Sequence, residues 1–437
     1  MNNLRLLTGL FAFALLSTGV WADAQTVISL EDIFKTAESQ SAQLRPALTA
    51  IEEARREVSV SRSKRLPDIS ASLSVSYISD GFTTKRDFSD YQAAPIPHLG
   101  TGFGVNINQP LYTGGAITSS IKLAELKTSA ARFAADFQRD NIRFQLTGFY
   151  LDLYKYSNLR TVIDGNLITA RKLLSEMNAR YAQGTALRND ITRYELLIAN
   201  LELEQTRIAN MLEILNNNLV SIAGLPDGTT VIPDSTILAK ALPLENEQWW
   251  LQEAESNSPR LKLARSVVNI SRQAEKLTKA ERLPSFGLHA GWTMDGPILV
   301  EIPPIDRNLS YWYVGLGVSY NISSLFKTNK ALARNRATTQ RAIEELDAKA
   351  QELSLAVRAD NLHYLEAYEE LRTQEKSVEL ANRNYRTTST RYLADMALIT
   401  DMLDAANSKL DAEQQLVNAR INIIYYYYKL LFTSGKI

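Results

Sequence analysis

Apolar and polar residues alternate strictly in the segment DISASLSVSY, residues 68–77. Every second position from Ile69 to Tyr77 is apolar, and the four positions between them are all serine. A period of two predicts a β-strand with one apolar face and one small polar face. Three later segments alternate in the same way. The sequence therefore predicts four strands, at residues 68–78, 101–111, 284–295 and 310–323.

Helical patterns occupy most of the remaining chain. The segment 29–64 predicts a helix that Pro67 ends. From Ile191 onward, apolar residues hold a heptad pattern for some thirty residues, roughly nine turns, which only Gln205 interrupts. The matching stretch of the second half has alanine at one heptad position and is interrupted by Lys409. Both stretches predict coiled-coil packing.

Each long helical stretch contains one predicted turn. In RYAQGTALRND, residues 180–190, Gly184 can take the left-handed conformation that a tight turn needs. In RYLADMALITD, residues 391–401, Asp395 stands at the matching place, and aspartate tolerates that conformation better than most residues. We therefore expect two antiparallel helical hairpins with their tips in these two segments.

The two halves of the chain repeat one another. AESQSAQL at 37–44 is echoed by AESNSPRL at 254–261, 217 residues later, and Gly224 recurs as Gly435, 211 residues later. A pattern that occurs only twice, with each copy about 200 residues long, indicates a duplicated domain. We expect a first repeat, a linker and a second repeat over residues 25–223, 224–248 and 249–437.

The first 24 residues have the composition of a secretory signal peptide. They carry one basic side chain, Arg5, then an apolar run, then a short segment suited to cleavage. An N-terminal membrane anchor is the alternative. After this segment no run of about 20 apolar residues follows, so no transmembrane helix is predicted.

Composition excludes several functions. The chain of 437 residues has 48 basic and 48 acidic side chains, no cysteine and three widely spaced histidines. A net charge of zero gives no basic field for nucleic acid, so no nucleic-acid partner is expected. The histidine spacing fits no metal motif, and no G-x-S-x-G occurs. We therefore expect no enzyme, no cofactor and no metal.

The four predicted strands suit a membrane better than a soluble sheet. Each is about ten residues long, enough to cross a bilayer when tilted. Their polar faces carry Ser, Gly, Asn and Thr without any Lys or Glu, which fits lipid outside and water inside. A half-buried soluble sheet is the alternative, but its polar face would usually carry charges. Because four strands cannot close a barrel, several copies of the chain would have to build one together.

These features resemble the TolC family of outer-membrane factors. The resemblance rests on the duplication, on R-L-P before the first and third strands, and on Q-P-L-Y-T-G-G at 109–115. It also rests on R-Y-x-x-G-x-A-x-x-x-D at 180–190 and on I-T-D-M-L-D-A at 399–405. It implies an α+β membrane protein that is a homotrimer with a twelve-stranded β-barrel, four strands per chain. A long α-helical barrel of coiled-coil hairpins would continue that barrel, with residues 224–248 in a mixed equatorial belt.

The resemblance also implies a function and partners. The chain would be a passive exit duct in the outer membrane, extending into the periplasm, of a tripartite efflux or type I secretion system. A periplasmic adaptor (membrane fusion) protein would open its tip, and an inner-membrane pump of RND, ABC or MFS type would supply energy. Its other contact would be outer-membrane lipid. The alternative is an envelope-anchored coiled-coil structural protein or adhesin without transport.

Two aspartates correspond to the constriction of such ducts. Asp401 and Asp404 lie three residues apart, which places both on one helix face. In a trimer they would form a ring of six carboxylates that repels anions. The alternative is that Asp401 caps the helix that begins there and Asp404 is simply solvated.

The resemblance further assigns a gate and docking tips. Tyr392 and Asp190 match a pair whose hydrogen bond holds the closed state. Ala397 stands where the best-known member has an arginine, so one link is absent or is replaced by Arg188 or Arg391. The expected adaptor contacts, for which simple turn geometry is the alternative, are Arg180, Tyr181, Gly184, Arg391 and Asp395.

Overall fold

A computed structural model of the chain describes residues 25–239, 242–301 and 303–437, so the predicted signal peptide, residues 1–24, lies outside the described residues. The chain divides into two compact units. The hairpin unit comprises residues up to 41, 145–241 and 370–421. The sheet unit comprises residues 42–144, 242–369 and 422–437.

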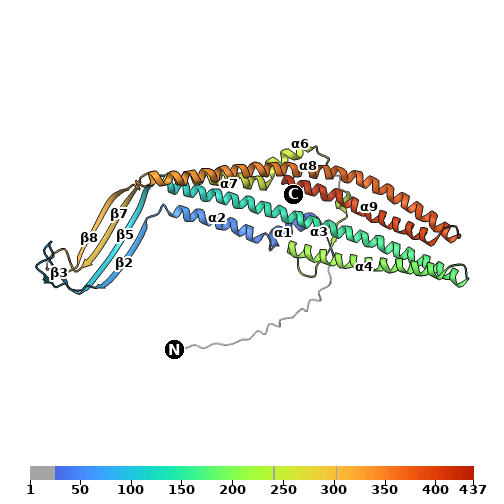
Figure 1. Ribbon diagram of the computed structural model, residues 1–437, viewed down its shortest axis with the longest axis horizontal. Coiled ribbons are helices and arrows are strands. Elements are labelled where there is room, and N and C mark those ends of the chain that lie inside the picture. The colour runs from blue at the N-terminus through green and yellow to red at the C-terminus, as the bar shows by residue number, and fades with distance from the viewer. Residues whose placement is uncertain (1–24, 240–241, 302) are drawn as a thin grey trace, which may run out of the picture. The chain divides into compact units, whose positions relative to one another are not determined.

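The order of elements along the chain repeats itself (Figure 1). The first series is α1 (Leu30–Gln40), α2 (Arg45–Ser63), β2 (Asp68–Tyr77), β5 (Leu99–Thr113), α3 (Ala116–Ala182) and α4 (Arg188–Ala223). The second is α6 (Glu247–Asn257), α7 (Pro259–Ala280), β7 (Ser285–Gly296), β8 (Leu309–Ser319), α8 (Ser324–Leu393) and α9 (Ile399–Ser434). The predicted α+β fold and its internal duplication are therefore confirmed.

The single helix predicted over 29–64 is wrong, because the structure has two helices there. Helix α1 ends at Gln40, and the next residue, Ser41, leaves helical geometry with ψ 121°. Pro46 then lies in the first turn of α2. Proline has no N–H for a helical hydrogen bond, so it is tolerated at the start of a helix but interrupts its interior.

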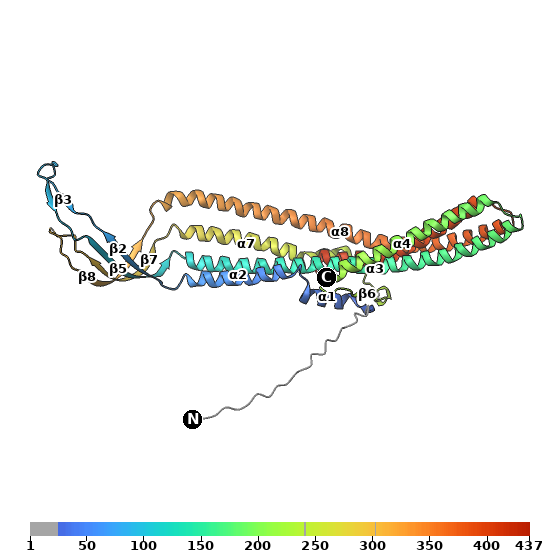
Figure 2. The ribbon, with the colours of Figure 1, turned by 90° about the horizontal axis from the view of Figure 1, so that it is seen from below.

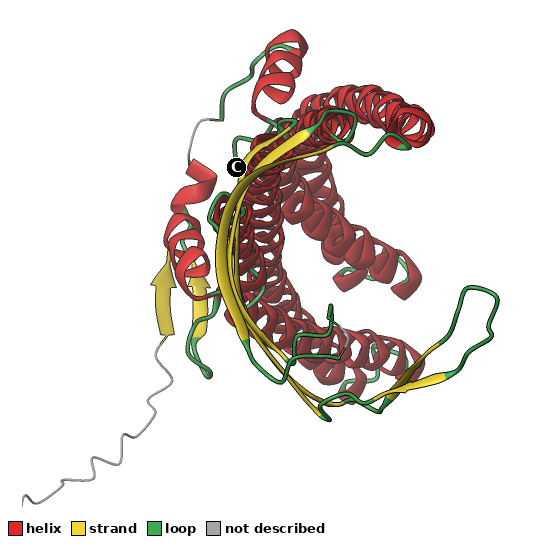
Figure 3. Cartoon of the chain, turned by 90° about the vertical axis from the view of Figure 1, so that its left-hand side faces the viewer, coloured by secondary structure: helices red, strands yellow, loops and turns green. Residues whose placement is uncertain are grey.

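The sheet unit contains one four-stranded antiparallel sheet in the order β2-β5-β7-β8. Figure 3 shows that this sheet is curved. Strand β8 ends at Ser319, four residues before the predicted end at 323. A turn replaces those residues, because the N–H of Ser324 donates to the carbonyl of Asn321 at 2.9 Å and helix α8 begins there.

The strand register brings the apolar positions of all four strands to one face. One row across the sheet contains Ile69, Ile107, Ala290 and Val314. The adjacent row, on the opposite face, contains Ser70, Asn106, Gly291 and Tyr313. The apolar side chains are not covered by this chain, since Leu73 of β2 is 75% exposed and Leu316 of β8 is 78% exposed. The serine pattern of 68–77 is thus one face of a sheet whose other face is apolar and open.

A small hairpin in the sheet unit was not predicted. Strands β3 (Gly81–Thr83) and β4 (Gln92–Ala94) pair in the segment between β2 and β5, which lies outside the four predicted strands. Figure 2 shows the hairpin, labelled β3, extending beyond the end of the four-stranded sheet.

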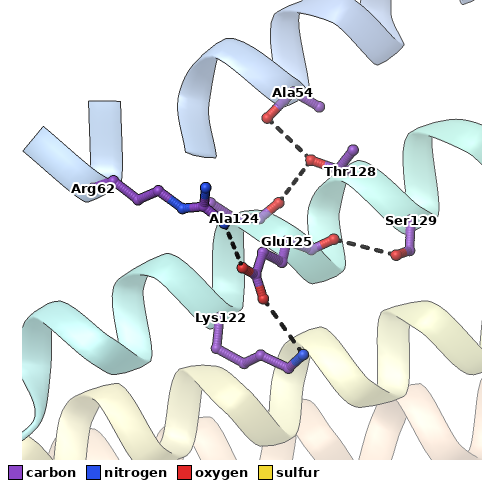
Figure 4. A network of polar contacts seen from close by, with 7 residues as sticks. All are labelled: Ala54, Arg62, Lys122, Ala124, Glu125, Thr128 and Ser129. Atoms are coloured by element: carbon purple, nitrogen blue, oxygen red, sulfur yellow. Dashed lines mark hydrogen bonds and ion pairs between the residues drawn. The ribbon is translucent and has the colours of Figure 1, made fainter. Parts of the chain in front are cut away.

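Helices of the sheet unit are joined by polar contacts. Thr128 of α3 donates to the carbonyl of Ala54 in α2 at 3.0 Å, and Arg62 of α2 lies 3.2 Å from Glu125 of α3 (Figure 4). Lys122 reaches the same carboxylate at 3.5 Å. These contacts fix α2 against the first part of α3. No helix within the described ranges has the length and apolar composition that crossing a membrane requires.

The hairpin unit has a core of heptad residues. The buried residues of α4 include Ile191, Tyr194, Ile198, Leu201 and Ile208, as the heptad predicted. They form one cluster with residues of α3 and α9. The small heptad residues of α9, Ala405, Ala412 and Ala419, are also buried. The unit also holds a parallel pair of short strands, β1 (Gln25–Ile28) and β6 (Thr230–Pro233), and the short helix α5 (Thr236–Ala239).

Candidate functional site at the hairpin tips

The two hairpin tips have the same backbone geometry. Between α3 and α4, Gly184 has φ 74°, and the N–H of Thr185 donates to the carbonyl of Arg180 at 3.0 Å. Between α8 and α9, Asp395 has φ 58°, and a backbone hydrogen bond between residues five positions apart again closes the turn. A left-handed residue after a helix is the usual way to end it, and glycine does so without strain. The second tip therefore places a carboxylate where the first has only hydrogen.

Arg180 reaches from the first tip to the second. One of its N–H groups donates to the carbonyl of Leu393 at 2.9 Å, and another pairs with the carboxylate of Asp395. Its side chain is only 21% exposed, whereas Asp395 is 73% exposed. A cation at the last carbonyls of α8 pairs with an oxygen that the helix leaves without a hydrogen bond and interacts favourably with the negative end of the helix dipole.

Within the described residues, the counterpart of this pair in the repeat is not formed. Arg391 is the counterpart of Arg180, but it is exposed and forms no ion pair within the described part of the chain. Its turn partner would be Gly184, which has no carboxylate. Arg180 and Asp395 were predicted separately as docking residues, and their contact was not predicted.

Tyr392 and Asp190 lie together, with the hydroxyl donating to the carboxylate at 3.5 Å. Tyr392 is buried. This burial, and secondly the negative charge of Asp190, raise the pKa of its hydroxyl to about 12. Its counterpart Tyr181 is half exposed, and its hydroxyl has no hydrogen-bond partner among the residues described. Among the described residues, the tyrosine–aspartate hydrogen bond between the tips therefore occurs once, from Tyr392 to Asp190.

The two predicted constriction residues lie on the exposed side of α9. The carboxylate of Asp401 accepts the N–H of Leu398 at 3.1 Å, so this residue caps the first turn of its helix. Asp404 is exposed one turn further on. Neither carboxylate has an ion-pair partner within the described ranges, and Met402 and Ala405 point into the core instead. Both carboxylates are exposed to solvent.

Ala397 stands where the resemblance places an arginine. Ala397 packs against the apolar core of the hairpin unit. Neither Arg188 nor Arg391 forms an ion pair within the part of the chain that the structure describes. Arg180 is the arginine that contacts the second tip.

The residues that interrupt the heptads meet polar groups of α3. Gln205 donates to Asp164 at 2.5 Å. Lys409 lies 3.1 Å from Glu413 and donates to Asn166 at 2.9 Å. The side chains of Lys409 and Glu413 are 16% and 21% exposed, so this ion pair is mostly buried. Gln205 and Lys409, the two residues that interrupt the heptads, therefore contact neighbouring positions of α3. No cluster of His, Asp and Glu that would suit a metal ion occurs in the ranges described.

The comparison with known families agrees with this architecture. A family model described as outer membrane efflux protein matches residues 33–225 and 250–425. The chain belongs to the outer membrane efflux protein family.

Members and structural neighbours of the family match nearly the whole chain. Outer membrane protein TolC of Vibrio cholerae is 21% identical over 94% of this chain and 91% of its own length. Outer membrane efflux protein BepC of Brucella suis is 22% identical over 98% and 90%. The protein is accordingly an outer-membrane protein.

Solved structures show the same fold. The outer-membrane channel OprN superposes with a TM-score of 0.77 at 16% identity, covering 93% of this chain and 90% of its own. The outer membrane protein VceC of Vibrio cholerae gives a TM-score of 0.76 at 17% identity, covering 93% and 96%. The resemblance inferred from the motifs is therefore confirmed at the level of family and fold.

Proposed function

We propose that three copies of the chain form a passive exit duct through the outer membrane for a tripartite efflux or type I secretion system. An adaptor protein opens its periplasmic tip, and an inner-membrane pump supplies the energy. Solute leaves through a water-filled tunnel, and the chain carries out no covalent chemistry. The observation that carries this proposal is the four-stranded sheet with an exposed apolar face and two edge strands that lack a second neighbour among the described residues.

The sheet favours closure by other copies. In hydrocarbon, each unpaired backbone group of β2 or β8 would cost several kcal/mol. Pairing β8 of one copy with β2 of the next removes both edges. Two copies would give eight strands, whose interior is filled by side chains, whereas three give twelve strands and leave a lumen. The small residues of the inner face, such as Ser70 and Gly291, suit that wide lumen.

The tips supply the gate of the proposed duct. In the closed state, Arg180 holds the second tip through Leu393 and Asp395, and Tyr392 holds Asp190. The adaptor contacts the turns at exposed groups that these links leave available, namely Tyr181, Gly184 and Arg391. Docking there favours a state in which the links are broken, and the tips separate.

The exposed carboxylates of α9 form the constriction. Three copies bring six carboxylates, from Asp401 and Asp404, to one ring. Rings of acidic side chains favour cations in channels. The closed or partly open duct is therefore cation-selective.

Planar bilayer recordings test this proposal. The purified protein should form pores whose reversal potential in a salt gradient shows a cation preference. Asp401→Asn with Asp404→Asn should weaken that preference. The matched control is Glu195→Gln, which neutralises an exposed carboxylate on α4 that lies outside the constriction. Absence of pores, or a preference that Glu195→Gln alters as much as the double variant, would contradict the proposal.

The alternative function, an adhesin, differs from the duct in where the hairpin tips lie. Protease added to intact cells should leave the tips at 180–190 and 391–401 uncut if they lie in the periplasm. Cleavage there in cells with an intact outer membrane would favour a surface-exposed stalk.

A further inference from the structure

The β3–β4 hairpin exposes three aromatic side chains. The rings of Phe82 and Tyr91 stack with centroids 4.6 Å apart and 24° between their planes. Phe82 is 61% exposed, Tyr91 68% and Phe88, at the turn, 89%. Aromatic side chains usually bury large areas, so an exposed group of three on a short hairpin indicates a surface that another partner covers.

The turn holds Phe88 outward by specific hydrogen bonds. Asp87 accepts from both the N–H of Ser89, at 3.1 Å, and its hydroxyl, at 2.6 Å. Lys85 and Ser89 are joined through their backbones at 2.9 Å. Phe88 has φ 63°, a conformation that bulky residues rarely adopt. The hairpin therefore keeps a defined shape while presenting this ring to its surroundings.

The sheet register places a second apolar segment at the same end of the sheet. Tyr77 pairs with Leu99, and Asp295 pairs with Leu309, so the hairpin after β2 and the segment before β8 emerge from one end. That segment, residues 297–301, includes Leu299 and Val300, which are 46% and 90% exposed. Backbone bonds of 2.9 and 3.0 Å between Ile298 and Ile305 hold it in place.

These two surfaces flank opposite edges of the sheet. The hairpin follows edge strand β2, and residues 297–301 precede edge strand β8. If β8 of one copy pairs with β2 of the next, the hairpin of one copy stands directly beside residues 297–301 of the other. Within a single chain the hairpin leads into β5 and residues 297–301 follow β7, the partner of β5, yet Phe82 and Val300 remain 61% and 90% exposed, so the chain does not cover them itself.

Charge also favours a protein occupant. Arg86 on the hairpin and Glu301 on the facing segment are exposed, and neither has an ion-pair partner within the described ranges. They can therefore pair across the seam. Lipid is disfavoured, because Asp87 and Asp90 flank Phe88 and carboxylates are costly in hydrocarbon.

We propose that the β3–β4 hairpin is an arm that clasps the neighbouring copy, packing Phe82, Phe88 and Tyr91 against its Leu299 and Val300. The partner is a second copy of this chain, and the contact continues the β2–β8 seam beyond the barrel wall. This inference rests on the proposed trimer.

Disulfide cross-linking in the native membrane tests the arm, and the chain has no cysteine to interfere. Tyr91→Cys combined with Val300→Cys should give covalent trimers on oxidation, and each single variant should give none. Copy number measured without cross-linking separates two failures. Trimers that do not cross-link overturn the arm alone, whereas monomers overturn the proposed function as well.

A spin label at Phe88→Cys identifies the occupant independently. Burial against a neighbouring copy predicts low accessibility both to oxygen, which concentrates in lipid, and to a water-soluble nickel complex. High accessibility to oxygen would assign the hairpin to lipid, and high accessibility to nickel would leave it in water. Either result overturns the proposal.

Discussion

Replacing Arg180 with glutamine should open the proposed gate by an amount that the contacts define. The ion pair with Asp395 contributes little, about 0.5 kcal/mol, because Asp395 is 73% exposed. The charge-assisted bond to the carbonyl of Leu393, at 2.9 Å from a mostly buried guanidinium, contributes about 1.5 kcal/mol. If the open state keeps neither contact, the closed state loses about 2 kcal/mol, or about 30-fold in the ratio of open to closed channels.

Two matched variants separate the parts of this link. Asp395→Gly removes only the ion pair and restores the residue that the first tip uses, so it should raise the ratio only about twofold. Arg391→Gln removes the repeat counterpart, which has no ion-pair partner within the described ranges, and should leave the ratio unchanged.

Single-channel recordings of open probability measure all three variants. The order expected is Arg180→Gln first, Asp395→Gly second and Arg391→Gln equal to the parent protein. An effect of Arg391→Gln as large as that of Arg180→Gln would refute the reasoning, since it would show that loss of charge at either tip is sufficient.

Three further predictions concern stability and are measured by thermal melts of helical circular dichroism in detergent. Lys409→Met leaves the largely buried Glu413 without its cation and should lower the free energy of unfolding by about 2–3 kcal/mol. Adding Glu413→Leu should recover most of this loss. If the single and the double variant melted at the same temperature, the two residues would not be coupled. Burial raises the pKa of Asp140 to about 6, so the folded state binds its proton more tightly than the unfolded state does. The free energy of unfolding should therefore fall as the pH rises from about 4 to about 6. Asp140→Asn should flatten that profile and stabilise the protein above pH 6 by up to about 3 kcal/mol, and a parent profile already flat would contradict this. Gly224→Ala should destabilise by more than about 1 kcal/mol, because φ is 73° and the new Cβ would lie 2.9 Å from backbone, whereas Gly165→Ala, with nothing within 4 Å, should stabilise.

The strands and heptads were predictable because their patterns are set by one-dimensional rules. A sheet with an apolar and a polar face forces a period of two, and DISASLSVSY shows it without interruption. The heptad from Ile191 likewise corresponds to the buried face of α4. Pro46 was present in the sequence as a signal for the break between α1 and α2, but the apolar periodicity of 29–64 concealed it.

The rest depends on contacts between distant residues. Arg180 and Asp395 are 215 positions apart, and no local pattern indicates that an arginine of one turn will meet an aspartate of another. Strands β3 and β4 have three residues each, too few for a period of two to be recognised. The glutamine and lysine in the heptads were visible as interruptions, but their partners on α3 were not.

The number of copies in the native complex tests the central claim most directly. Native mass spectrometry of the detergent-solubilised protein should give an assembly of three identical chains, because twelve strands close the sheet around a lumen. A stable monomer would leave the outer edges of β2 and β8 unpaired in lipid, and a dimer would close eight strands with no room for a duct. Either mass would contradict the account.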